Sequence, residues 1–170
     1  MTQPRRLLVC GLGSIGRRYL RLLHELAPSL ELAACRSGHG PDCPEQDLLV
    51  ACFSSLAEAL EWQPEAAIVA SPAPFHGAQA AELAAAGVAL LIEKPLGTGE
   101  EPLPAWLPLQ SAAMKGLPVL VGYVLRHDPA LPLLQAWLAA GRIGTPVSAH
   151  GRCGSWLPDW RPGSDYRQGA

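Results

Sequence analysis

The chain has 170 residues, of which 49% are hydrophobic and 16% charged, and this composition excludes a globally disordered protein. The formal net charge of −2 and the lack of a long basic block argue against nucleic acid or an anionic membrane as a partner. The sequence has no apolar run of about 18 residues, so it predicts no membrane span. The five cysteines form no Cys-x-x-Cys pair, from which we expect no metal, no disulfide and a reducing, cytoplasmic location.

Short apolar runs alternate with helical patterns from residue 7 to residue 123. The predicted strands are residues 7–10, 30–35, 51–53, 66–70, 89–92 and 118–123. The predicted helices begin near Ile15 and at a capping box of Ser55 and Glu58, and two more cover residues 74–86 and 106–115. Strands that are apolar on both faces and alternate with helices predict an α/β fold with a doubly wound parallel sheet.

The pattern is weaker beyond residue 123. Residues 131–140 predict a helix that Gly141 ends, and residues 147–153 predict a strand. Residues 154–170 are rich in Gly, Pro, Trp and Arg without any period, so we expect a loop there.

A glycine-rich turn joins the first predicted strand to the first predicted helix. Gly11 permits a tight turn, Gly13 lets the backbone approach a pyrophosphate, and Gly16 allows close packing of the helix on the strand. Ser14 and Ile15 begin the helix, whose N-terminal N–H groups and dipole favour an anion. Residues 11–16 therefore predict a dinucleotide site, and the alternative is a turn that is merely tight.

The end of the second predicted strand indicates which dinucleotide is bound. A carboxylate there would bond the ribose 2′-hydroxyl of NAD, but residues 33–37 contain none. Arg36 can instead pair with a 2′-phosphate, and Ser37 can donate to the same group. We therefore expect NADP in preference to NAD, with a solvated loop arginine as the alternative reading of Arg36.

Two further strand ends carry polar residues that point to the same crevice, because ligands of such sheets bind at the carboxyl ends of the strands. Ser71, Pro72 and His76 follow one strand, although a histidine at a helix start is often a cap or a surface residue. Glu93 and Lys94 follow the next strand. We expect Lys94 to be partly desolvated and suited to proton transfer, although Glu93 beside it can hold the amine charged.

These segments together resemble the glucose–fructose oxidoreductase / inositol dehydrogenase / MocA family. The resemblance runs from residue 7 to about residue 167 and depends on the order and spacing of several motifs. They are the turn of residues 11–16, Ser71-Pro72 with His76, Glu93-Lys94-Pro95-Leu96-Gly97, and residues 64–70, 122–129 and 141–144.

The resemblance implies an oxidoreductase whose Rossmann domain binds NAD(P) and which moves a hydride to or from a sugar-like or polyol-like substrate. It implies that Lys94 contacts the nicotinamide ribose and the substrate and assists proton transfer. By the same resemblance, Ser71, His76 and Glu93 line the cofactor crevice, and Arg126 lies near the nicotinamide.

The family also sets an expectation for the last part of the chain. Trp160 and Arg161 resemble a pair that folds back over the cofactor, and family members continue well beyond that point. We therefore expect a Rossmann domain over residues 1–121 and the truncated start of an α/β C-terminal domain over residues 122–170. Such a chain is expected to be inactive alone, and a homo-oligomer is expected only with the full second domain. The alternative is a non-catalytic NADP-binding module or a truncated gene product.

Overall fold

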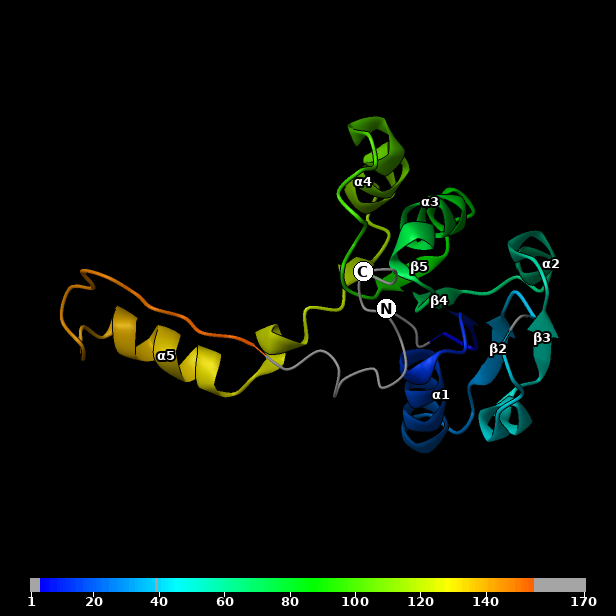
Figure 1. Cartoon of the computed structure of the whole chain (residues 1–170), viewed down its shortest axis with the longest axis horizontal. Helices are drawn as coiled ribbons and strands as arrows, with labels where there is room; N and C mark the ends of the chain where they lie inside the picture. Colours follow the sequence, from blue (N-terminus) through cyan, green and yellow to red (C-terminus); the bar gives the residue numbers. More distant parts are fainter. Residues whose placement is uncertain (1–3, 39, 155–170) are drawn as a thin grey trace. The chain divides into compact units, whose positions relative to one another are not determined.

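The structure is a computed structural model that describes residues 4–38 and 40–154 (Figure 1). The chain divides into two compact units, residues 1–122 and residues 123–170.

A parallel sheet forms the centre of the first unit. Its strand order is β3-β2-β1-β4-β5-β6, and every neighbouring pair runs parallel. This order, which reverses between β1 and β4, confirms the predicted doubly wound α/β sheet. The strands are β1 (Arg6–Cys10), β2 (Glu31–Cys35), β3 (Ala51–Phe53), β4 (Ala66–Val69), β5 (Ala89–Ile92) and β6 (Val119–Val121).

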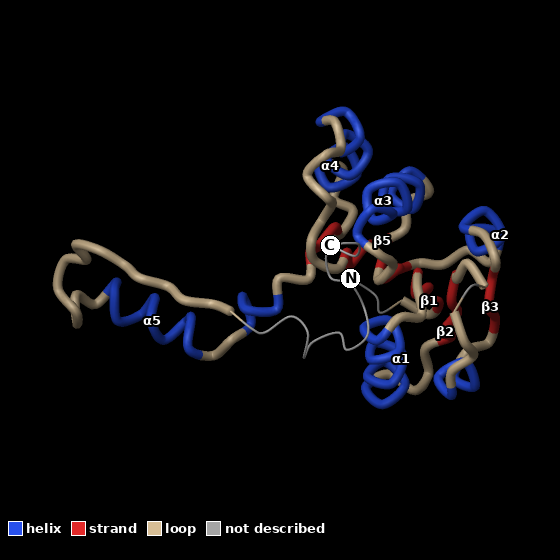
Figure 2. Tube along the Cα trace, viewed as in Figure 1, coloured by secondary structure: helices blue, strands red, loops and turns tan. Residues whose placement is uncertain are grey.

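Helices cover both faces of this sheet, as Figure 2 shows for the first unit. The α-helices are α1 (Ser14–Leu26), α2 (Leu56–Glu61), α3 (His76–Ala85) and α4 (Leu107–Met114). Three short 3₁₀ helices lie in the connections between these elements, namely η1 (Pro44–Leu48), η2 (Ala73–Phe75) and η3 (Leu103–Trp106). The helix predicted from residue 74 thus begins with a 3₁₀ turn, in which Pro74 has no N–H to donate.

The alternation of side chains along each strand divides the core into two layers. Leu8 and Cys10 of β1 pack in the layer that contains residues of α2, α3 and α4. Leu7 and Val9 of the same strand pack in the layer under α1. Because both faces of the strand are buried, the strand reads as a continuous apolar run in the sequence.

The second unit begins with η4 (Val124–His127) and continues into α5 (Ala130–Ala139), which confirms the helix predicted over residues 131–140. The strand predicted over residues 147–153 is wrong, because these residues form no strand and Val147 is 98% exposed. A strand needs a neighbour to pair its N–H and C=O groups, and the described part of the second unit supplies none. The loop predicted over residues 154–170 lies outside the described residues except for Gly154.

Candidate cofactor site

The glycine-rich turn lies at the point where the strand order reverses. Gly11 has a φ of +97°, and a Cβ atom on it would lie 2.8 Å from the Cα of Ser71, so no other residue fits without strain. The Gly11 N–H donates to the carbonyl of Cys35 over 2.8 Å. The turn therefore meets the carboxyl ends of both β2 and β4.

The start of α1 provides a cradle for an anion. A Cβ atom on Gly16 would lie 1.9 Å from the carbonyl oxygen of Gly11, which explains the close approach of helix and turn. A Cβ atom on Gly13, by contrast, would meet nothing within 4 Å. Gly13 is the N-cap of α1, no side chain caps the helix, and its first turn, which begins with Ser14 and Ile15, has no acidic residue. The N–H groups of this turn fit the pyrophosphate of a dinucleotide.

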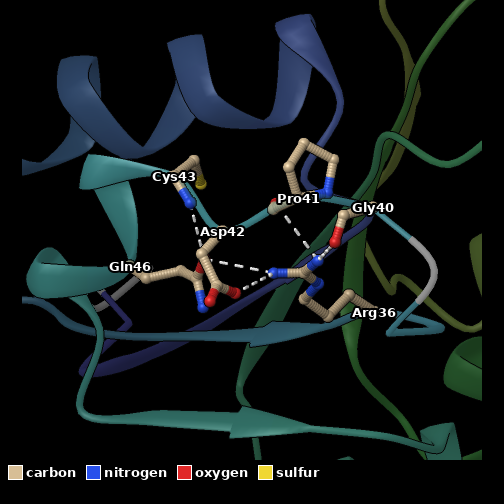
Figure 3. A network of polar contacts seen from close by, with 6 residues as sticks. All are labelled: Arg36, Gly40, Pro41, Asp42, Cys43 and Gln46. Atoms are coloured by element: carbon tan, nitrogen blue, oxygen red, sulfur yellow. Dashed lines mark hydrogen bonds and ion pairs between the residues drawn. The ribbon is translucent and has the colours of Figure 1, made fainter.

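Arg36 follows β2 and turns its guanidinium group onto the next loop (Figure 3). Its Nη1 donates to Oε1 of Gln46 over 3.1 Å and to Oδ1 of Asp42 over 3.4 Å. Its Nη2 donates to the carbonyl of Pro41 over 3.2 Å and also to that of Gly40. With only 13% of its side chain exposed, Arg36 is not the solvated loop residue of the alternative reading.

The sequence did not indicate Asp42 as a site residue. Residues 33–37 at the end of β2 hold no carboxylate, whereas the turn-rich segment that follows folds back and places Asp42, six residues after Arg36, beside it. Ser37, next to Arg36, is exposed. The structure thus places one cation and one carboxylate at the end of β2.

His76 links the ends of β4 and β5. It is only 2% exposed, which makes the surface reading of this residue wrong. Its Nδ1 lies 2.8 Å from the carbonyl oxygen of Pro95 and its Nε2 lies 2.7 Å from that of Ser71. Both partners are backbone carbonyl oxygens, one in the loop after β4 and one in the loop after β5. His76 therefore holds two strand-end loops together.

Ser71 and Pro72 begin the loop between β4 and α3. The Ser71 hydroxyl donates to Oε1 of Gln79 over 2.7 Å, so α3 orients this side chain. Pro72 is the N-cap of η2 and is exposed. The backbone of Ser71 contacts the glycine turn, which brings the first and second motifs of the sequence together.

Glu93 is buried and Lys94 is exposed. The Tyr19 hydroxyl donates to Oε1 of Glu93 over 2.6 Å, and the Lys94 N–H donates to Oε2 over 3.1 Å. Burial, together with the hydrogen bond to Glu93, raises the pKa of Tyr19 above its ordinary value. Glu93 takes the inward position after β5 and Lys94 lies at the surface, so the role of Lys94 in proton transfer stays a prediction. The sequence motifs had not indicated Tyr19 as a site residue.

The remaining predicted site residues belong to the second part of the chain. Arg126 lies in η4 of the second unit, where its N–H donates to the carbonyl of Tyr123 over 2.9 Å and its side chain is exposed. Its place near a nicotinamide stays a prediction. Trp160 and Arg161 lie outside the described residues.

Within residues 4–38 and 40–154, no group of three or more His, Cys, Asp and Glu residues could hold a metal ion. All five cysteines are free. No helix in the same described ranges is long and apolar enough to cross a membrane.

The fold and the glycine turn define a dinucleotide-binding protein of the Rossmann class. Residues 5–123 match the model of the GFO_IDH_MocA family, described as an oxidoreductase family with an NAD-binding Rossmann fold. The chain belongs to this family, as the sequence motifs indicated.

Curated relatives are inositol dehydrogenases. The chain is 36% identical over 86 residues to inositol 2-dehydrogenase 3 of Saccharopolyspora erythraea, a match that covers 51% of this chain and 25% of that protein. It is 30% identical over 138 residues to myo-inositol dehydrogenase Hyg17 of Streptomyces leeuwenhoekii, covering 80% of this chain and 42% of that protein. The chain thus spans less than half the length of these relatives.

Solved structures with the same fold include scyllo-inositol dehydrogenase from Lactobacillus casei with bound NAD(H) and scyllo-inositol. It has a TM-score of 0.68 and 22% identity, and the match covers 84% of this chain and 43% of that one. The WlbA dehydrogenase from Bordetella pertussis, in complex with NADH and UDP-GlcNAcA, has a TM-score of 0.64 and 26% identity, with coverages of 82% and 40%.

Proposed function

We propose that residues 1–121 bind NADP(H) in preference to NAD(H), as the cofactor domain of an oxidoreductase that acts on a sugar-like or polyol-like substrate. The observation that carries the proposal is the meeting of the uncapped N-terminus of α1 with the carboxyl ends of β2 and β4. Ligands of doubly wound sheets bind at this reversal of strand order. When bound, the nicotinamide ring supplies or accepts the hydride.

The glycine turn and α1 hold the pyrophosphate in this proposal. Because Gly13 has no side chain, the space beside it is open to the pyrophosphate. The first-turn N–H groups of α1 donate to the phosphate oxygens. Because no acidic side chain lies in this turn, nothing there repels the anion. Beyond β2, Arg36 and the exposed Ser37 would receive the 2′-phosphate of NADP(H).

Lys94 is the proposed acid and base for the proton that accompanies hydride transfer. Glu93 fixes the backbone at Lys94 through its hydrogen bond to the Lys94 N–H, while Tyr19 fixes Glu93. Lys94, an exposed residue, thereby stands on an anchored strand end. Ser71 and His76 lie at the same carboxyl edge of the sheet, where His76 joins two loops through its hydrogen bonds to two backbone carbonyls.

The first experiment measures NADPH and NADH binding to the chain by the change in cofactor fluorescence. The wild-type chain should bind NADPH more tightly than NADH. Arg36→Ala should weaken NADPH binding at least about tenfold, since it removes charge-assisted hydrogen bonds, and leave NADH within about threefold. Arg142→Ala, which removes an exposed arginine of the second unit, is the matched control. A chain that binds neither cofactor contradicts the proposed site.

The second experiment tests the chemistry with myo-inositol, the substrate class that the relatives' names indicate. In a protein that turns this substrate over, Lys94→Ala should abolish turnover while cofactor affinity stays within about threefold. Turnover that persists in Lys94→Ala would contradict the proposed role of Lys94 as the acid and base.

A second candidate is a cofactor-binding module without turnover. The described part of the second unit favours it, because that part offers one exposed turn with Arg126, one helix and no strand. Turnover of myo-inositol by this 170-residue chain with either cofactor would contradict this second candidate function.

A further inference from the structure

Asp42 differs from the other groups that contact the Arg36 guanidinium. Gln46 and the carbonyls of Gly40 and Pro41 are neutral acceptors, whereas Asp42 carries a negative charge. Its carboxylate makes a single contact of 3.4 Å to Nη1 and is 93% exposed (Figure 3). An ion pair that is exposed and this long is weak, so the carboxylate can leave it at small cost.

The neutral partners keep Arg36 in place without Asp42. Oε1 of Gln46 accepts from Nη1 of Arg36 and also from the N–H of Cys43, over 2.8 Å, so Gln46 is itself oriented. Gln46 belongs to η1, and η1 is tied to α1 by the ion pair between Arg21 and Glu45. The backbone N–H of Glu45 itself and the Arg21 guanidinium lower the pKa of Glu45, so this pair stays charged near neutral pH. Removing the Asp42 charge therefore leaves the guanidinium group where it is.

We propose that Asp42 is a specificity-determining residue that competes with the 2′-phosphate of NADP(H) for Arg36. The inference rests on the proposed cofactor site. A 2′-phosphate that pairs with Nη1 of Arg36 must displace the carboxylate and then lies close to a like charge. The 2′-hydroxyl of NAD(H) has no charge to repel and can donate to the carboxylate. Arg36 thus favours NADP(H), Asp42 favours NAD(H), and their balance sets the preference.

The test compares Asp42→Asn with the wild-type chain. The variant should bind NADPH about fivefold more tightly, because one like charge near the phosphate is removed, and NADH at most equally well. Adenosine 2′,5′-bisphosphate and adenosine 5′-monophosphate, used as competitors, isolate the same effect, since only the first carries a 2′-phosphate. The gain in affinity of Asp42→Asn for adenosine 2′,5′-bisphosphate should shrink at high salt, where charge repulsion is screened.

Asp47→Asn is the matched control, because Asp47 is an exposed acidic residue of η1 and the substitution changes the net charge equally. Its NADPH to NADH affinity ratio should stay within about twofold of the wild-type ratio. An Asp42→Asn ratio that equals the wild-type or the Asp47→Asn ratio overturns the inference.

The outcomes separate this inference from the proposed function. A wild-type chain that binds neither cofactor overturns both. A wild-type preference for NADH overturns only the preference proposed above, and a shift toward NADPH in Asp42→Asn then still supports the role of Asp42. Binding with an unchanged ratio in Asp42→Asn overturns the role of Asp42 alone.

Discussion

The two halves of the sheet's carboxyl edge are built differently. Beyond β4 and β5, His76 and Glu93 are buried and each makes two hydrogen bonds inside the first unit. Beyond β2, Arg36 meets an exposed loop, and Asp42 is almost fully solvated. Buried polar groups without partners are costly, so the first half tolerates little change. The second half can change its charge at little cost in stability, and our proposal predicts that the cofactor preference changes with this charge.

The largest effect is expected at Gly16, in the turn that both halves share. Gly16→Ala places a Cβ atom 1.9 Å from the carbonyl oxygen of Gly11, and the resulting backbone shift should lower the free energy of unfolding by at least about 3 kcal/mol. Urea unfolding followed by circular dichroism measures this loss.

Gly13→Ala is the control for that change, because its Cβ atom meets nothing within 4 Å and its φ of −67° suits alanine. Its free energy of unfolding should not fall by more than about 0.5 kcal/mol, while cofactor binding weakens as the cradle narrows. Equal stability losses in both variants would contradict the different roles of the two glycines.

His76→Ala tests the buried half directly. It leaves the carbonyls of Ser71 and Pro95 without their partner and opens a void, so we expect a loss of about 2–3 kcal/mol in the free energy of unfolding. His24→Ala, at an exposed position of α1, should change it by less than about 0.5 kcal/mol. A His76→Ala chain as stable as His24→Ala would show that the bridge between the two loops contributes nothing.

Cys10 is buried at the end of β1, and because of this thiol we expect the free energy of unfolding to fall at alkaline pH. Burial raises the pKa of its thiol from 9.0 to about 12. Between these values the unfolded chain releases the proton and the folded chain keeps it, so stability that is complete below pH 9 is lost as pH rises toward 12. The loss amounts to roughly 2 kcal/mol by about pH 10.5.

Unfolding in urea at several alkaline pH values, compared between wild type and Cys10→Ala, measures the contribution of this thiol. The variant should lose less stability over the same pH range, because it has no proton to release there. Parallel pH curves for the two chains would contradict the assignment to Cys10.

The smallest effect on stability is expected in the exposed half. Asp42→Asn removes one long, solvated ion pair, so the free energy of unfolding should change by less than about 0.5 kcal/mol. The same variant is expected to change the cofactor preference. A loss of stability as large as that of His76→Ala would contradict the proposed difference between the two halves of the edge.

The sequence alone predicted the sheet and the glycine turn, because both depend on local patterns. Runs such as residues 7–10 and 89–92 are apolar on both faces, and a buried parallel strand requires that. The spacing of Gly11, Gly13 and Gly16 reflects steric limits within one turn. The strand predicted over residues 147–153 was wrong, since strand formation depends on a partner that local pattern does not reveal.

The site depends on contacts that only the tertiary structure decided. Tyr19 and Glu93 are 74 residues apart in the chain, and only the packing of α1 on the sheet joins them. His76 was buried by the docking of two loops, and Lys94 was left exposed because Glu93 faced inward. The segment after Arg36 folded back to place Asp42 beside it. Residue types and short spacings determine local conformation and chemistry, whereas burial and charge pairing depend on which distant groups meet.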